Sequence, residues 1–270
     1  MSEPIHILYI SQEIHPYLQE ETPMRIMGRK LPEFCQSHGC DTRTFMPKFG
    51  EINERRNQLH EVIRLSGTNI MISDMDHPTL IKVASIQSAR VQVYFIDNDD
   101  YFKRRKGVTD EKGNWYPDND ERTIFYCRSV LETINRQRWT PDIIHVSGWM
   151  SALAPLYIKK AFNDAPFFAK AKVVFSVFDQ KMNQTFGTKF ADKLLIPGVT
   201  PEDVASLKGR KVTYNQLIKL AIDYSDGVIQ STPKISPTLT THIKQSALPF
   251  LPYQENIEAY LDFYKHLLGK

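Results

Sequence analysis

The sequence has few cysteines and no pattern that would pair them. The three cysteines are Cys35, Cys40 and Cys127, and no two of them form a CxxC arrangement. A disulfide framework needs an even set at regular spacings, so the sequence excludes a small disulfide-stabilised scaffold. We therefore expect a protein of a reducing compartment, for which the cytoplasm is the simplest location.

Long apolar runs are also absent, as is a targeting segment. No apolar run reaches the roughly 18 residues that a membrane-spanning helix requires. The first residues lead directly into a strand pattern, without the basic and apolar regions of a secretory leader. We therefore expect no membrane association.

The chain has no large excess of positive or negative charge. The chain has 34 basic and 31 acidic side chains, which gives a formal net charge of +3. Nucleic-acid-binding proteins usually carry a strong basic excess on one face, so we expect no nucleic-acid partner. The dense basic run Lys103-Arg104-Arg105-Lys106 is interpreted as a solvated loop.

The common motifs of metal sites and activated nucleophiles are missing. There is no phosphate-binding Walker loop, no HExxH and no GxSxG. Asp97-Asn98-Asp99 has the DxD form of a metal site, but Asp and Asn also make turns and helix caps. Cys35, His38 and Cys40 lack a fourth zinc ligand. We therefore expect no metal and no cofactor.

Apolar strand patterns alternate with helical patterns along most of the chain. This alternation predicts an α/β protein with a Rossmann-like, doubly wound and mainly parallel sheet. Shorter strands favour a hairpin insertion, and a polar loop follows them over 103–119. Pro32 predicts a kink or interruption in its helix, and Gly39 a cap at its end. The strands are expected over 5–10, 41–47, 59–65, 69–72, 79–86, 91–97, 141–147, 172–178 and 226–231, and the helices over 24–38, 120–138, 148–162, 214–225 and 256–268.

Ligands of such sheets bind outside the carboxyl ends of the strands, which places the candidate site in the segments 11–24, 98–119, 145–149 and 178–187. The first of these contains HPYLQEETPM (15–24), between a strand and a helix. Helix N-termini and glycine amides usually bind phosphate at this position. Here the loop has two adjacent carboxylates and neither glycine nor lysine, so we expect it to repel phosphate.

Four stretches, in this order, resemble one family, the bacterial glycogen and plant starch synthases, which transfer glucose from ADP-glucose. The resemblance covers most of residues 5–235. It implies one half of a fold with two Rossmann-like domains and an active site in the cleft between them. The stretches are ILYISQEIHPY (7–17), VYFIDNDDYFKRRKG (93–107) with YPDNDERTIFYCRSVLE (116–132), PDIIHVSGWMSALAPLYIKK (141–160) and AIDYSDGVIQSTP (221–233).

The chain departs from the family pattern at the donor loop. Against the family's K-T-G-G-L, Gln19 or Glu20 replaces the lysine, and Thr22 and Pro23 replace the glycines. The resemblance implies that the lysine faces the donor phosphates, so a carboxylate here opposes the same ligand. Proline also removes an amide donor.

Two further elements of the cleft are changed. The family's H-x-H-D-W is His145-Val146-Ser147-Gly148-Trp149, which keeps only the first histidine and the tryptophan. The family's T-[VI]-H-N is Ser176-Val177-Phe178-Asp179, with Phe178 in place of a histidine that lies near the reacting sugar. Three altered loops predict lost catalysis, and His145 is left open between a structural and a chemical role.

The chain divides into residues 1–235, the synthase-like domain, and 236–270, a linker and a C-terminal helix expected to pack back on it. Residues 234–270 are too few for the second domain, which needs roughly 100 residues. AYLDFYKHLL (259–268) resembles the helix with which full-length synthases return to the first domain. An internal loss of the second half is our hypothesis, and an unrelated amphipathic helix is the alternative.

Three functions follow as hypotheses. The first is a non-catalytic domain whose former cleft binds an α-glucan, a protein partner or a second copy of the chain. The second is an active glucosyltransferase that uses ADP-glucose or UDP-glucose and is completed by a second chain. The third is a structural interaction protein without a small ligand. No residue is assigned to catalysis. The aromatic candidates for sugar stacking are Trp115, Tyr116 and Trp149. The candidate cleft residues are Glu20, Glu21, Thr22, Tyr116, Asp118, Asn119, His145, Ser147, Trp149, Phe178 and Asp179.

Overall fold

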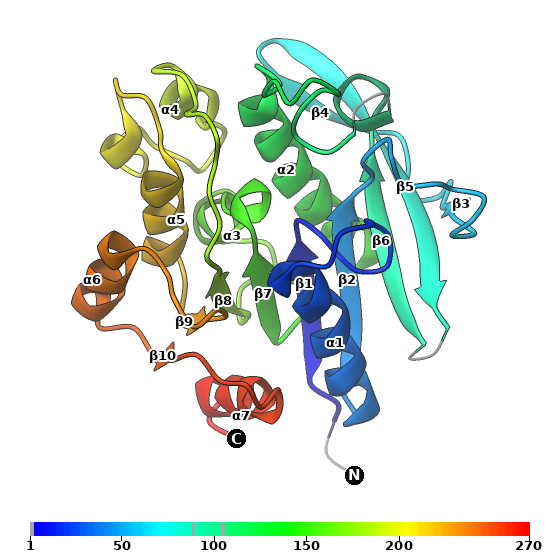
Figure 1. Ribbon diagram of the computed structural model, residues 1–270, viewed down its shortest axis with the longest axis vertical. Helices are drawn as coiled ribbons and strands as arrows, with labels where there is room; N and C mark the ends of the chain where they lie inside the picture. The colour runs from blue at the N-terminus through cyan, green and yellow to red at the C-terminus, as the bar shows by residue number, and fades with distance from the viewer. Residues whose placement is uncertain (1–2, 88–89, 104–105) are drawn as a thin grey trace.

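The computed structural model describes residues 3–87, 90–103 and 106–270. Its centre is a ten-stranded sheet with the order β10-β9-β8-β7-β1-β2-β6-β5-β3, and β4 pairs with β5 beside this path (Figure 1). The strands are β1 His6–Ser11, β2 Asp41–Pro47, β3 His60–Glu61, β4 Thr68–Ile72, β5 Met75–Ile86, β6 Val91–Asp97, β7 Ile143–Ser147, β8 Lys172–Val177, β9 Gly227–Gln230 and β10 Phe250–Leu251.

The sheet is parallel from β10 to β6 and antiparallel where β5 joins β6 and where β3 and β4 join β5. The predicted α/β class and mainly parallel sheet are confirmed. The helices are α1 Pro23–Ser37, α2 Asn119–Gln137, α3 Ala154–Lys160, α4 Phe190–Lys193, α5 Tyr214–Asp223, α6 Pro237–Ser246 and α7 Glu258–Leu267, with short helical turns at Asp99–Lys103, Trp149–Ser151 and Ala205–Leu207.

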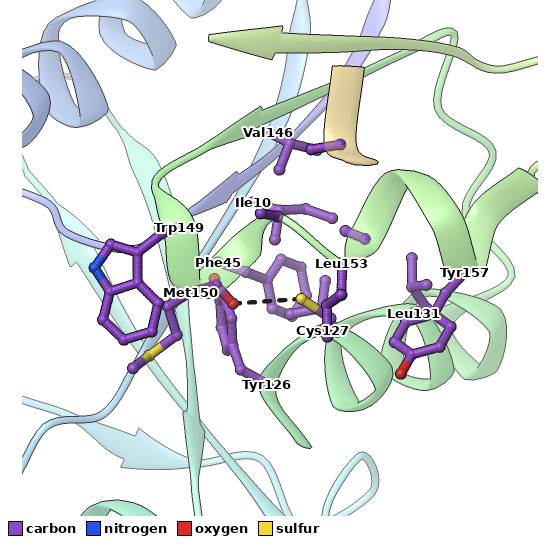
Figure 2. Close-up of a cluster of buried hydrophobic side chains, with 14 of the residues drawn as sticks. Ile10, Phe45, Tyr126, Cys127, Leu131, Val146, Trp149, Met150, Leu153 and Tyr157 are labelled. Carbon is purple, nitrogen blue, oxygen red and sulfur yellow. Dashed lines mark hydrogen bonds between the residues drawn. The ribbon is translucent and has the colours of Figure 1, made fainter. Parts of the chain in front are cut away.

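Each central strand sends alternate side chains to opposite faces of the sheet, and both faces are buried. In β1, Leu8 and Ile10 join the large core beneath α2, α3 and α5, whereas Ile7 and Tyr9 face the core beneath α1 and α7. Figure 2 shows part of the large core, where Ile10 and Val146 lie among side chains of α2 and α3. Burial on both faces explains why these strands have continuous apolar runs.

Three predicted elements differ from the observed ones. The strand expected over 59–65 is reduced to β3, because the chain turns where the amides of Leu65 and Ser66 donate to the Val62 carbonyl. The helix expected over 148–162 is divided into a helical turn and α3. Pro155 lies in the first turn of α3, where an amide hydrogen would have no acceptor within the helix, so proline is tolerated there. α1 passes through Pro32 as one helix, and Gly39 (φ 83°) follows its end as predicted.

The helix expected over 256–268 is α7, and it lies against the sheet. Four of its side chains are buried with residues of β1, β7, β8 and β9: Tyr260, Leu261, Phe263 and Tyr264. Gly227 of β9 provides room for it, since a Cβ there would lie 3.1 Å from both Phe263 and Leu267. In Figure 1, α7 and α1 lie on the same side of the sheet. The C-terminal helix is thus part of the second core.

Because Tyr264 is fully buried in this core, we expect Tyr264→Ala to lower the free energy of unfolding by about 3–5 kcal/mol. The control is Asp262→Ala on the exposed side of the same helix, for which we expect a change of about 0.5 kcal/mol or less. Urea denaturation followed by circular dichroism measures both. Equal effects of the two substitutions would contradict the integral role of α7.

Candidate functional site

Four serines mark the carboxyl ends of neighbouring parallel strands. Ser11 and Ser147 are the last residues of β1 and β7, Ser176 is the last but one of β8, and Ser231 follows β9. All four are buried, and they bond in pairs: Ser147 Oγ donates to Ser11 Oγ at 3.3 Å and Ser231 Oγ to Ser176 Oγ at 3.0 Å. The floor of the candidate cleft therefore consists of hydroxyls that satisfy one another.

The loop after β1 is held by Arg25 of α1. Its guanidinium donates to the Glu13 carboxylate at 2.7 Å and to the Glu20 carbonyl at 2.8 Å. The Thr22 hydroxyl accepts from the Arg25 amide at 3.2 Å and so caps α1. Since Arg25 is paired with Glu13, while the Glu20 and Glu21 carboxylates are exposed, the loop presents negative charge to the cleft.

The turn after β7 is filled by two glutamines. Gly148 has φ 89°, and a Cβ there would lie 2.5 Å from the Gln12 Cβ, so this position needs glycine. Gln12 Oε1 accepts from the Met150 amide at 3.1 Å, and Gln180 Oε1 from the Trp149 amide at 3.3 Å. These two backbone donors, which could otherwise hold an anion at the start of a helical turn, are already bonded.

His145 lies below this turn, on the side of the sheet that α7 covers. A hydrogen bond between its Nδ1 and the hydroxyl of Tyr264 joins β7 to α7. Burial lowers the pKa of His145 to about 3 and raises the pKa of Tyr264 well above its ordinary value, so both groups are neutral near pH 7. His145 therefore has a structural role, and a general base would need a higher pKa.

Phe178 follows β8 and is buried at the edge of the cleft. Its carbonyl accepts from the Tyr214 hydroxyl at 3.0 Å, and the next amide, that of Asp179, donates to Thr232 Oγ1 at 2.8 Å. The Asp179 carboxylate is exposed beside it. This turn is thus fixed by α5 and by the segment after β9.

Three hollows adjoin one another along the carboxyl edge. One of about 220 Å³ lies between the Thr22–Arg25 turn and Phe178–Gln180. It shares Phe178–Gln180 with one of about 480 Å³ that extends to residues 213–215 and 234–237. The third hollow, of about 330 Å³, adjoins the first on its other side. Glu13 and Arg25 line both, and the third hollow reaches Glu20 and residues 106–109. Together they form what we call the edge groove.

The structure brings together only some of the predicted cleft residues. The edge groove is lined by Glu20, Thr22, Phe178 and Asp179. Glu21 follows Glu20 in the chain. His145 and Ser147 lie beneath it beside a void of about 10 Å³, which holds one water molecule at most.

Two expectations for the remaining predicted residues are wrong. Trp149 was expected to offer an exposed ring to a sugar, but it is 2% exposed and packs among core side chains, 5.2 Å from the Trp115 ring (Figure 2). Asn119 is fully buried, and its amide bonds Arg122 and the Val108 carbonyl. Tyr116 and Asp118 lie beside it, half-buried at the start of α2, and line none of the three hollows.

The candidate metal ligands have other partners. The buried Asp97 carboxylate pairs with Lys82 Nζ at 2.8 Å, and Asn98 Oδ1 accepts from the amides of Asp100 and Tyr101. A hydrogen bond with Cys40, together with burial, raises the pKa of the Cys35 thiol, which disfavours the thiolate that zinc needs. Within the described residues, no three His, Cys, Asp or Glu side chains gather as a metal site.

The basic run is described in part. Lys103 pairs with Asp99 and Lys106 with Glu111, both at 2.9 Å and at exposed positions, in agreement with a solvated loop. Arg104 and Arg105 lie outside the described residues. None of the helices in the described part of the chain combines the length and apolarity that crossing a bilayer requires.

The residues that sequence reasoning missed are Gln12, Arg25, Gln180 and Thr232. Gln12, Gln180 and Thr232 lie within three residues of a strand end, which was the available signal, whereas Arg25 lies in the first turn of α1. Their roles as caps of neighbouring loops depend on which strands are adjacent in the sheet.

Comparison with known proteins identifies the family. The family model described as starch synthase catalytic domain matches residues 6–258. The glycogen synthase of Chlorobium luteolum is 32% identical over 230 residues, which are 85% of this chain and 46% of that protein. The glycogen synthase of Chlorobium limicola is 35% identical over 201 residues, 74% of this chain and 40% of that protein. The chain thus spans about half the length of these relatives.

A solved structure agrees with the fold. The catalytic domain of starch synthase IV from Arabidopsis thaliana, bound to ADP and acarbose, superimposes with a TM-score of 0.74 at 16% identity, over 95% of this chain and 52% of that one. The chain belongs to the starch synthase catalytic domain family. It is a glycogen and starch synthase-like glycosyltransferase domain with a Rossmann-like fold.

The buried His145 makes stability depend on pH. Its folded-state pKa of about 3 is below the unfolded value of about 6.5, so the unfolded chain binds the extra proton between these values. Because of His145, we expect the free energy of unfolding to be about 2 kcal/mol lower at pH 5 than at pH 7. Urea denaturation of the parent chain and of His145→Gln at both pH values measures this. The same pH dependence in both proteins would contradict the assignment.

Proposed function

We propose that this chain is a non-catalytic member of the starch synthase family whose edge groove binds an α-glucan. The observation that carries the proposal is the bonding of the turn after β7, where Gln12 and Gln180 occupy the amides of Met150 and Trp149. A donor diphosphate would need such amides, or a cation, and would have to displace both side chains.

The loop after β1 supports the same conclusion. Thr22 caps α1 and Pro23 brings no amide donor, so the helix N-terminus has little to offer a phosphate. Arg25, the cation nearest this turn, is paired with Glu13 at 2.7 Å. The exposed carboxylates of Glu20 and Glu21 add repulsion. Phe178 lies where the family pattern has a histidine near the reacting sugar, and it offers no hydrogen bond.

The larger part of the edge groove supports a glucan ligand. Exposed amides and a hydroxyl line it at Asn183, Gln184 and Thr185, together with the half-buried Tyr214. The exposed Lys181 and Lys234 line it as well. Apolar atoms of Met182 and Ile235 lie in the same wall. Glucose units present polar edges and apolar faces, so a wall of amides mixed with apolar side chains is complementary to them. The volume of about 480 Å³ is in the range of small-ligand sites.

The division of the chain into residues 1–235 and 236–270 is part of this proposal. The burial of α7 against the sheet supports a returning helix, whereas α6 and β10 occupy much of the segment interpreted as a linker. The internal loss of a second half stays a prediction. A glucosyltransferase completed by a second chain is the alternative, and it would need a partner chain that supplies the donor domain.

We expect the double substitution Asn183→Ala/Gln184→Ala to weaken binding of maltoheptaose at least about fivefold, because it removes two hydrogen-bonding amides from the groove. Isothermal titration calorimetry measures the affinity. Asn69→Ala/Asn163→Ala is the matched control, since both amides are exposed and line none of the hollows of the edge groove. Equal affinities of the two variants would place the glucan elsewhere, and no binding by the parent chain would refute the proposal.

We expect the purified chain to release no ADP or UDP above background from ADP-glucose or UDP-glucose in the presence of maltoheptaose. The reason is the internally bonded donor edge described above. A coupled assay for nucleoside diphosphate measures the release, with an active glycogen synthase as positive control. Sustained release that scales with the concentration of the chain would overturn the non-catalytic assignment.

A further inference from the structure

A further hollow lies at the opposite edge of the sheet. Its volume is about 580 Å³, and four arginines line it: Arg43, Arg64, Arg136 and Arg138. Arg43 lies near the start of β2, and Arg136 and Arg138 lie at the end of α2. The amino ends of the parallel strands meet here, whereas the edge groove follows their carboxyl ends. We call this hollow the arginine pocket.

The positive charge of the arginine pocket is not neutralised by the protein. Its lining includes no carboxylate, and among the described residues no carboxylate lies within 4.0 Å of the four guanidinium groups. Two acids are nearby. Asp41 accepts from the Trp139 indole at 3.0 Å and interacts electrostatically with Arg43, and Glu132 interacts with Arg136, but neither acid lines the pocket.

Two of the arginines are held in place before any ligand arrives. The Arg43 guanidinium lies 4.6 Å from the centre of the Trp139 ring and donates to the Gln137 side chain. Arg136 donates to the Leu65 carbonyl at 3.3 Å and to the Thr68 hydroxyl. Each guanidinium has five N–H donors, so further donors remain for a ligand. Fixing a side chain in advance lowers the entropy lost on binding.

The end of α2 accounts for part of this cluster. Cations in the last turn of a helix interact favourably with its dipole, which suits Arg136 and Arg138. Arg43 and Arg64 come from β2 and from the turn before β4, so the helix dipole does not explain their presence. Four like charges around one hollow repel each other, and this favours an anion among them.

We propose that the arginine pocket binds a small molecule that carries phosphate groups. Planar guanidinium groups form paired hydrogen bonds with phosphate oxygens, and arginine is the side chain best suited to them. The concave shape and volume fit a small ligand. A nucleic acid does not fit the near balance of basic and acidic residues in the chain as a whole. The site is separate from the edge groove and does not depend on the glucan proposal.

Isothermal titration calorimetry of the full chain with inorganic pyrophosphate at low ionic strength tests the proposal. We expect saturable binding of one pyrophosphate per chain. Arg64→Gln/Arg138→Asn should weaken it at least about tenfold, since two charge-assisted contacts are lost. Both side chains are exposed, and asparagine tolerates the left-handed backbone of position 138 (φ 52°), so the variant is expected to fold.

The matched control is Arg55→Gln/Arg56→Gln, which removes the same charge at two exposed positions outside the arginine pocket. Its affinity for pyrophosphate should stay within about twofold of the parent value. Glucose 1-phosphate, tested against inorganic phosphate, distinguishes a sugar phosphate from a simple anion. Absence of saturable binding, equal weakening by both double variants, or tighter binding of a single-stranded oligonucleotide than of pyrophosphate would each overturn the proposal.

Discussion

Burial of the central parallel strands on both faces is the constraint on which the rest of this structure depends. β1, β7, β8 and β9 send apolar side chains alternately to two cores, and each core needs a cover of helices. α2, α3 and α5 cover one face, and α1 together with α7 covers the other. Without α7, side chains such as Ile143, Val174 and Ile229 would lose part of their cover. The C-terminal residues are therefore tied to the first strand of the chain.

The same packing determines the chemistry at the carboxyl edge. His145 is buried between the sheet and α7 and bonds Tyr264, so it is a neutral structural group. Above it, hydroxyls bond hydroxyls, and Gln12 and Gln180 occupy backbone amides that could face a ligand. An edge whose polar groups are satisfied internally gains rigidity and loses affinity for an anion. Its open part is lined by amides and hydroxyls together with Lys181, Lys234 and Asp179.

The two edges of the sheet thus differ in charge. The carboxyl edge, where ligands of α/β sheets usually bind, carries both signs of charge: Glu20, Glu21 and Asp179 are exposed there, and so are Lys106, Lys181 and Lys234. The amino edge collects four arginines without a paired carboxylate. The edge groove therefore mixes acidic and basic side chains, whereas the arginine pocket is lined by cations alone among its charged residues.

Elements with strong local patterns could be predicted, whereas elements defined by their neighbours could not. The apolar runs of β1, β2, β6, β7 and β8 and the period of α2 were found because two-sided burial and amphipathic packing leave a direct record in the sequence. The short α4 and β10 were missed because their few residues carry too little periodicity, and α6 was missed because only Leu239 and Ile243 are buried along it. Trp149 was misplaced because an aromatic beside a strand end has the same sequence signal whether it packs inward or faces a ligand.

By itself the sequence determined the α/β class, the strand and helix order, the family resemblance and the acidic character of the loop at 15–24. These properties depend on residue type and on spacing along the chain, which the sequence contains directly. Only the tertiary structure decided that His145 bonds Tyr264, that glutamines cap the β7 turn, and that Arg43 and Arg64 meet Arg136 and Arg138. The physical reason is that each of these contacts joins segments far apart in sequence, and their meeting depends on the order of strands in the sheet.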